Sequence, residues 1–362
     1  MIIGHGGNIF ALAEKLGCLP DDIIDMSSNI NPLGPMPGIM AYLKENLSDL
    51  EMLPEADAGT LILKFSAQYG IGPERILAGS GTTQFIYALP MALDARQALI
   101  LGPTYADYAD ACSMVNTACH WEIATEDTEF VPDLDSLAAK IPGMDLVFIC
   151  NANNPTGRLI PGSDLEALCR AHPQTVFVID ESYLPFVPGA EDETMLDRPL
   201  PNVVVLHSMS KIYKIPGLRL GFLIGPEKII EKLRKYQLPW GVNALAQTAA
   251  HFLFDEKRAV DAFVQETRTF IRAEMQSFFN SLRGHGLLKA YPSTTTFLLI
   301  KLPASLRAEQ VCEIFGRKKI LLRNCDNFHG LSDRFIRIAL KNPQINRRVA
   351  EELQMIFRES AS

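Results

Sequence analysis

Short, almost wholly apolar segments, separated by longer stretches of mixed polarity, constrain the fold of this chain more than any other feature. Strands that are apolar on both faces are typical of a mainly parallel sheet with helices covering both sides. The intervening stretches carry helical patterns, such as the apolar positions of 60–69 ahead of Gly70 and a capping-box pattern at 163–166. We therefore predict an α/β fold, with strands at Ile76–Ala78, Ala98–Leu101, Leu146–Cys150, Val176–Ile179, Val203–Leu206 and Leu218–Ile224.

The pattern changes at about residue 243. Long helical patterns run to about residue 282, and strands are then predicted at 296–301, 320–323 and 335–340. A last helix is predicted to begin after Asn342 as N-cap, with Pro343 in its first turn. We place a large domain at 31–241 and a small α+β domain at 1–30 and 242–362.

Composition excludes several classes of protein. The 362 residues suffice for roughly two domains. A net charge of −8 argues against binding to nucleic acid. The seven cysteines contain no CxxC pair, so neither a metal site nor a disulfide framework is predicted. No signal-peptide pattern or membrane span is present, and we expect a cytoplasmic protein.

The first polar motif, Gly79-Ser80-Gly81-Thr82-Thr83, lies between a predicted strand and a predicted helix. Glycines there let the backbone approach an anion, and a helix N-terminus supplies N–H donors for phosphate. The segment matches neither a dinucleotide fingerprint nor a P-loop. Alone, it is equally consistent with an ordinary strand–helix turn.

Three further polar motifs follow predicted strands, where ligands bind in open parallel sheets. Asn154 belongs to Asn153-Asn154-Pro155-Thr156-Gly157, which alone could be a simple turn. Asp180 ends a strand and would need a cationic partner if it is buried. Lys211 ends Ser208-Met209-Ser210-Lys211, ahead of Arg219. A desolvated lysine is a nucleophile for carbonyl carbon, although most single lysines are surface residues.

Taken together and in this order, the motifs resemble those of the fold-type I family of pyridoxal-phosphate-dependent aminotransferases over nearly the whole chain. The resemblance implies a large domain with a mainly parallel seven-stranded sheet, a smaller α+β domain, pyridoxal 5'-phosphate as cofactor, and a homodimer with the site at the interface. It implies that Lys211 forms the Schiff base, that Asp180 pairs with the ring nitrogen and that Tyr105 stacks on the ring. The remaining cofactor-binding residues that it implies are Asn154 and Tyr183 at the ring hydroxyl, and Gly81, Thr82, Thr83, Ser208, Ser210 and Arg219 around the phosphate.

Within that family, four segments are similar to the branch of histidinol-phosphate aminotransferases and, more closely, of the L-threonine-O-3-phosphate decarboxylases of cobalamin synthesis. They are 5–8, 28–34, 239–245, and 322–325 with the following Gly330-Leu331. The resemblance implies decarboxylation of L-threonine O-3-phosphate to (R)-1-amino-2-propanol O-2-phosphate. It assigns the substrate carboxylate to Arg337, with Asn154 nearby, and the substrate phosphate to Arg323, His5 and Asn31.

The motifs are also consistent with other functions. A histidinol-phosphate-type aminotransferase and a decarboxylase of L-serine O-phosphate would need similar cations. A non-catalytic pyridoxal-phosphate sensing module is a hypothesis of another class. The bond that breaks depends on which bond at Cα stands perpendicular to the cofactor ring, and sequence does not show that torsion. Leu53 also stands where relatives carry a Tyr that reaches the cofactor phosphate of the neighbouring subunit.

Overall fold

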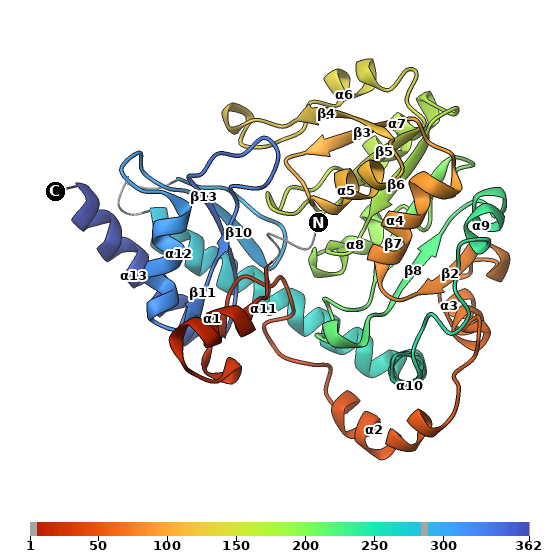
Figure 1. Ribbon diagram of the computed structural model, residues 1–362, viewed down its shortest axis with the longest axis horizontal. Coiled ribbons are helices and arrows are strands. Elements are labelled where there is room, and N and C mark those ends of the chain that lie inside the picture. Colours follow the sequence, from red (N-terminus) through yellow and green to blue (C-terminus); the bar gives the residue numbers. More distant parts are fainter. Residues whose placement is uncertain (1–5, 284–288, 362) are drawn as a thin grey trace.

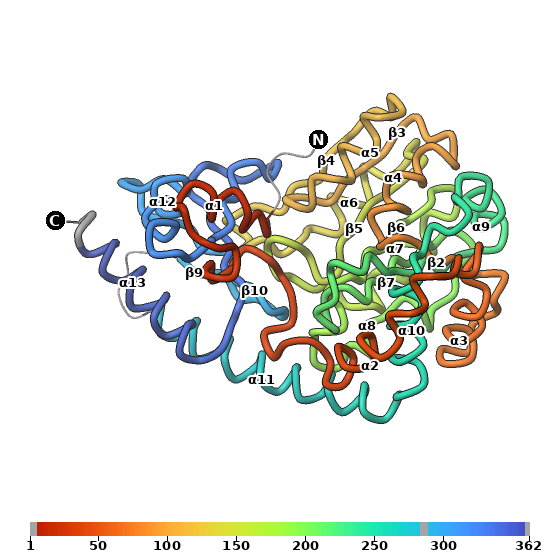
Figure 2. Tube along the Cα trace, turned by 60° about the horizontal axis from the view of Figure 1, so that its bottom comes forward, coloured from red at the N-terminus to blue at the C-terminus, as the bar shows by residue number. Residues whose placement is uncertain are grey.

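In the computed structural model, which describes residues 6–283 and 289–361, a large lobe built on one sheet lies beside a smaller lobe (Figures 1 and 2). The long helix α11 (Lys257–Arg283) runs from the large lobe to the small one, where it packs against α13 (Pro343–Ala361). The domain boundaries at 30/31 and 241/242 stay predictions.

The large lobe contains the seven-stranded, mainly parallel sheet that the sequence predicted. Its spatial order is β2-β8-β7-β6-β5-β3-β4, and β8 alone runs antiparallel to both of its neighbours. Most of its strands are buried on both faces, which explains their continuous apolar sequences. The edge strand β4 was not predicted, because its six residues alternate between polar and apolar. The strands are β2 (Ile76–Gly79), β3 (Gln97–Gly102), β4 (Ala118–Ile123), β5 (Leu146–Cys150), β6 (Val176–Asp180), β7 (Val203–Ser208) and β8 (Gly221–Ile224).

The helix predicted at 60–69 is confirmed as α3, whereas the start predicted for α7 is not. In α3, Leu61 and Phe65 are buried and Gly70 ends the helix in a left-handed conformation, as expected. The capping box predicted at 163–166 is wrong: the N-cap is Pro161, and the side chain of Glu193 accepts a hydrogen bond from the Gly162 N–H instead (2.7 Å). The helices are α2 (Ile39–Glu45), α3 (Gly59–Tyr69), α4 (Thr82–Ala92), α5 (Asp107–Met114), α6 (Leu134–Lys140), α7 (Gly162–Ala171), α8 (Ala190–Glu193) and α9 (Glu227–Arg234). Beyond the predicted boundary at 241/242, α10 (Ala244–Asp255) packs against α2 and α3.

The small lobe has an antiparallel sheet of order β12-β13-β10-β9, formed by β9 (Lys289–Ala290), β10 (Phe297–Lys301), β12 (Arg323–Asn324) and β13 (Phe335–Ala339). The strand predicted at 320–323 is split, since β11 (Ile320–Leu321) pairs instead with β1 (Ile24–Asp25). That pairing brings the N-terminal segment into the small lobe. The lobe also contains α1 (Ile9–Leu16), α12 (Ala308–Arg317) and α13, whose N-cap Asn342 accepts a hydrogen bond from the Ile345 N–H (2.9 Å), as predicted.

Short 3-10 turns connect several of these elements, and two of them border the cavities described below: Leu184–Phe186 and Pro216–Leu218. Of the helices in the two described ranges, none combines the length and apolar character needed to cross a bilayer.

Candidate active site

One edge of the large sheet collects the polar motifs. Strands β2, β3, β5, β6 and β7 all end at this edge, and β8, which runs the other way, begins there, with Gly221 opposite both Gly79 and Ser208. The segments carrying Gly81, Asn154, Asp180, Lys211 and Arg219 therefore leave the sheet side by side, although they span about 140 positions of sequence.

These segments enclose a cavity that we call the inner cavity. It is lined by Thr82, Thr83, Ile86, Tyr105, Tyr108, Cys150, Asn154, Asp180, Ser182, Tyr183, Ser208, Ser210, Lys211 and Arg219. The structure thus brings together all the cofactor-binding residues expected from sequence, with Gly81 directly against Arg219. Tyr108, Cys150 and Ser182 were not anticipated, although Tyr108 lies only three residues after Tyr105, in the first turn of α5.

Lys211 and Asp180 both line this cavity, and burial shifts the pKa of each. Burial lowers the pKa of the Lys211 amine to about 8, and the guanidinium groups of Arg219 and Arg337 act in the same direction. Burial raises the pKa of the Asp180 carboxyl, against hydrogen bonds from Ser182 and Tyr108 and the charge of Lys211. A lysine with a depressed pKa is partly neutral near pH 7 and can act as a nucleophile or a base.

Both oxygens of the Asp180 carboxylate are fixed. The Ser182 N–H donates to Oδ1 (2.9 Å), and the Tyr108 hydroxyl donates to Oδ2 (2.8 Å). Tyr108 is itself fully buried, stacks on Phe148 with ring centroids 5.1 Å apart, and meets the Tyr105 ring edge-on at 5.8 Å. The carboxylate is therefore held in one orientation at the floor of the cavity.

The opposite end of the inner cavity is a cradle for an anion. The N-terminus of α4 and the hydroxyls of Ser208 and Ser210 surround it, together with Arg219. Gly81 has φ +76°, and a Cβ on it would lie 2.5 Å from Arg219 Nη2. A Cβ on Gly221 would lie 2.7 Å from the Thr82 backbone nitrogen. Both glycines are needed for this close approach of backbone and guanidinium.

A second cavity of about 400 Å³, the outer cavity, opens beside the first. It shares Tyr105, Asn154, Tyr183 and Lys211 with the inner cavity and adds Arg323 and Arg337 from the small lobe. Burial raises the pKa of the Tyr183 hydroxyl to about 12, with the charge of Arg337 acting in the opposite direction. The outer cavity is thus the space between the two lobes next to Lys211.

Arg323 and Arg337 are cross-strand partners on β12 and β13. They are 9% and 4% exposed, and burial lowers the pKa of both guanidinium groups. Arg337 donates to Asn154 Oδ1 and to the Ser27 carbonyl, and Arg323 donates to Asn327 Oδ1 (2.7 Å) over the ring of Phe328. Within the described part of the chain, neither arginine forms an ion pair with a carboxylate.

The structure does not bring Asn31 into either cavity. Its fully buried amide donates to the Ile212 carbonyl and the Thr267 hydroxyl (both 2.8 Å) and accepts from the Leu33 N–H (2.9 Å). Asn31 therefore holds the loop after Lys211 against α11. Asn29, two residues earlier, lines the outer cavity instead, and its place in the same Asn-Ile-Asn segment was the only signal for it. His5 lies outside the described residues.

Comparison with known proteins identifies the family to which this chain belongs. The model of aminotransferase class I and II matches residues 21–353, and the chain belongs to that family. Its fold is that of the fold-type I pyridoxal-phosphate enzymes, as the sequence resemblance implied.

Individual members of the family that resemble this chain have more narrowly defined activities than the family as a whole. The chain is 33% identical to the threonine-phosphate decarboxylase of Salmonella typhimurium, over 98% of this chain and 96% of that protein. It is 31% identical to the adenosylcobalamin biosynthesis bifunctional protein CobDQ of Leptospira interrogans, of whose length it spans only 41%. The crystal structure of L-threonine-O-3-phosphate decarboxylase from Porphyromonas gingivalis superposes with a TM-score of 0.83 at 28% identity, over 93% of this chain and all of that one.

The inner cavity fits pyridoxal 5'-phosphate, the cofactor of this family. The cradle at Gly81 and Arg219 can hold the phosphate of the cofactor. The buried carboxylate of Asp180, whose charge would be costly without a partner, can pair with the protonated ring nitrogen. The aldehyde requires an amine, and Lys211 lines the same cavity. Tyr105 and Asn154 border the space between these ends.

Proposed function

We propose that this enzyme decarboxylates L-threonine O-3-phosphate to (R)-1-amino-2-propanol O-2-phosphate in the synthesis of cobalamin. The relatives at 31–33% identity support this substrate. The structural observation that carries the proposal is the buried pair of Arg323 and Arg337 in the outer cavity. Like charges opposite each other on neighbouring strands are destabilising. A substrate with both a carboxylate and a phosphate would compensate them.

Bound pyridoxal phosphate supplies an electron-withdrawing ring that accepts the electron pair of a breaking bond at Cα. Asp180 would keep the ring nitrogen protonated, and Tyr105, which lines the same cavity, would offer its aromatic face to the ring. We assign the substrate carboxylate to Arg337 and the phosphate to Arg323. Holding both ends sets the torsion about Cα, so that the bond to the carboxylate can be aligned for cleavage.

Lys211 is the group that moves a proton. Its depressed pKa, about 8, allows the amine to pick up a proton and release it again near neutral pH. When carbon dioxide is lost, Cα must gain a proton in its place, and we assign that proton transfer to the Lys211 Nζ because Lys211 lines both cavities. One proton is consumed and one carbon dioxide released per turnover, so the reaction needs no second substrate.

An aminotransferase of histidinol-phosphate type is the alternative, because the same family contains it and its substrate also carries a phosphate. The two are separated by supplying L-threonine O-3-phosphate labelled at the carboxylate and measuring carbon dioxide release, in parallel with amino transfer from L-histidinol phosphate to 2-oxoglutarate. Carbon dioxide release with little amino transfer supports the proposal. Amino transfer without carbon dioxide release refutes it. L-serine O-phosphate serves as the competing substrate for decarboxylation.

We also propose a cytoplasmic homodimer whose interface includes the apolar surface formed by the segments 50–53 and 238–240. Leu53 is 77% and Leu238 73% exposed, and the Trp240 N–H donates to the Ala56 carbonyl (2.8 Å), which places the two segments together. Exposed apolar surface of this kind marks a site of association. Light scattering of the eluting protein would test this, and a monomer at micromolar concentration would refute it.

A further inference from the structure

A cavity larger than the outer cavity lies apart from the cofactor site. It measures about 660 Å³ and lies between the end of α3, strand β7, the segment 181–197 and the first half of α11. We call it the rear cavity. Its volume is within the range of small-molecule sites.

The rear cavity lies behind the catalytic residues. Glu181 directly follows Asp180, the last residue of β6, and His207 directly precedes Ser208, the last residue of β7. Asp180 and Ser208 line the inner cavity, whereas Glu181 and His207 line the rear cavity. Successive side chains of a strand point to opposite faces. The strand ends that present Asp180 and Ser208 to the cofactor therefore present Glu181 and His207 to the rear cavity, which makes it a separate site.

The charges that face the rear cavity are unbalanced. Arg268 pairs with Glu191 (2.6 Å) and Lys257 pairs with Asp261 (3.4 Å), so both cations are neutralised. Glu181 and Asp197 have no cationic partner among the residues that the structure describes. Glu181 is 2% exposed, and it accepts hydrogen bonds only from the Thr194 hydroxyl and the Met195 N–H (both 2.6 Å).

Aromatic groups stand beside these carboxylates. The rings of Tyr69 and His207 meet edge-on, 5.7 Å apart. Tyr213 is 8% exposed and lines the cavity, and its side chain has no hydrogen-bond partner among the described residues. Aromatic faces next to uncompensated carboxylates are the chemistry that recognises an organic cation. No His, Cys, Asp and Glu group in the described residues could hold a metal ion, so an inorganic ion is a poor fit.

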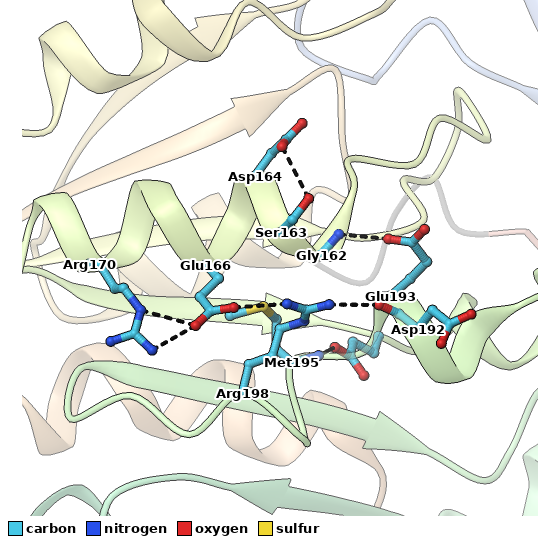
Figure 3. Close-up of polar contacts among 10 residues, drawn as sticks. Gly162, Ser163, Asp164, Glu166, Arg170, Asp192, Glu193, Met195 and Arg198 are labelled. Atoms are coloured by element: carbon cyan, nitrogen blue, oxygen red, sulfur yellow. Dashed lines mark hydrogen bonds and ion pairs between the residues drawn. The ribbon is translucent and has the colours of Figure 1, made fainter.

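The wall of the cavity is preformed, as Figure 3 shows for the segment that leads to Asp197. Arg198 donates to Glu166 Oε2 (2.8 Å) and to the Asp192 carbonyl (2.9 Å), and Glu193 accepts from the Gly162 N–H. A fixed wall loses little conformational entropy when a ligand binds.

We propose that the rear cavity is a second ligand site, which binds a small organic ammonium ion between the carboxylates of Glu181 and Asp197 and the rings of Tyr69 and Tyr213. The site is independent of the decarboxylation proposed above. Because Glu181 and Asp180 are consecutive residues, an occupant would lie one peptide unit from the group that holds the cofactor ring.

The test is calorimetric titration of the holoenzyme with choline chloride, with potassium chloride as the control for charge and ionic strength. Choline is suitable because its quaternary nitrogen cannot displace the lysine from the cofactor. We expect saturable choline binding in the millimolar range. Burial raises the pKa of Glu181 to about 7, so a cation beside it should release about half a proton at pH 7, seen as heat that depends on the buffer's ionisation enthalpy.

Three variants locate the binding. Asp197→Asn should weaken choline binding about threefold, because one exposed carboxylate is lost. Asp192→Asn removes the same charge five residues away, outside the rear cavity, and should leave binding unchanged. Glu181→Gln should abolish the proton release. An unchanged cofactor absorbance shows that each variant is folded. Absence of saturable heat, equal binding of potassium, or equal effects of the two aspartate variants would each overturn the proposal.

Discussion

Replacing Tyr108 by Phe tests how the protein keeps a buried carboxylate charged. The change removes only the hydroxyl that donates to Asp180 Oδ2 (2.8 Å) and keeps the ring that stacks on Phe148. The Ser182 N–H remains on the other oxygen. Since burial already raises the pKa of Asp180, each hydrogen bond that favours the ionised form opposes that rise.

The size of the effect follows from the burial of both partners. A hydrogen bond to a charged group contributes about 1.5–3 kcal/mol. One pKa unit corresponds to about 1.4 kcal/mol, so losing this bond should raise the pKa of Asp180 by roughly one to two units. A less ionised Asp180 holds the positive charge on the ring nitrogen less firmly. We therefore expect the Tyr108→Phe enzyme to bind pyridoxal phosphate roughly 10- to 100-fold more weakly.

Two measurements on the Tyr108→Phe enzyme check this. Titration of the apoenzyme with pyridoxal phosphate gives the dissociation constant, and the absorbance of the cofactor–lysine linkage is followed against pH. Less positive charge on the ring should move the midpoint of that pH titration upward. Tyr87→Phe, on α4, is the control, because it removes a phenol hydroxyl that has no hydrogen bond to Asp180. Equal affinities and equal midpoints in Tyr108→Phe and wild type would refute the reasoning.

Further predictions concern the remaining charged and interface groups. Lys211→Ala should lose the linkage absorbance and reduce turnover about 10²- to 10⁴-fold, measured as carbon dioxide release. Arg337→Lys should raise KM for the amino-acid substrate at least about 10-fold in steady-state kinetics, because a lysine cannot bind a carboxylate through two parallel bonds. Glu181 has its pKa raised from 4.5 to about 7, so its neutral form favours folding, and the contribution of Glu181 to the free energy of unfolding should fall by up to roughly 3 kcal/mol between pH 5 and 8. Urea unfolding of the apoenzyme should not show that loss in Glu181→Gln. Leu53→Asp should shift the proposed dimer toward monomer in light scattering.

The sequence predicted the parts of the fold that follow from local pattern. Strands such as Val176–Asp180 were found because both faces are buried, whereas β4 was missed because its exposed edge residues break the apolar run. The capping box failed because Glu166, although correctly spaced, binds Arg170 and Arg198 instead of the helix N-terminus (Figure 3). Its spacing alone could not reveal that competition.

Tertiary placement decided which residues line the candidate site. Asn29 and Asn31 are the same residue type in one turn-rich segment, and only packing against α11 shows that Asn31 is structural while Asn29 faces the outer cavity. Likewise, no sequence spacing shows that Arg323 and Arg337 are opposite each other, because their register depends on the pairing of β12 with β13. Sequence motifs therefore identified the cofactor groups better than the substrate groups.

That difference follows from where the cofactor groups and the substrate groups lie in the fold. The cofactor groups lie at one sheet edge, in motifs next to strand ends that leave a local signature in the sequence. The substrate groups come from the small lobe, and Arg337 donates a hydrogen bond to Asn154 of the large lobe. Burying two like charges across from each other costs stability that the fold recovers only when an anion is present. The pair is therefore better explained by the substrate than by folding, since a substrate with two anionic groups would neutralise both arginines in the cavity that Lys211 also lines.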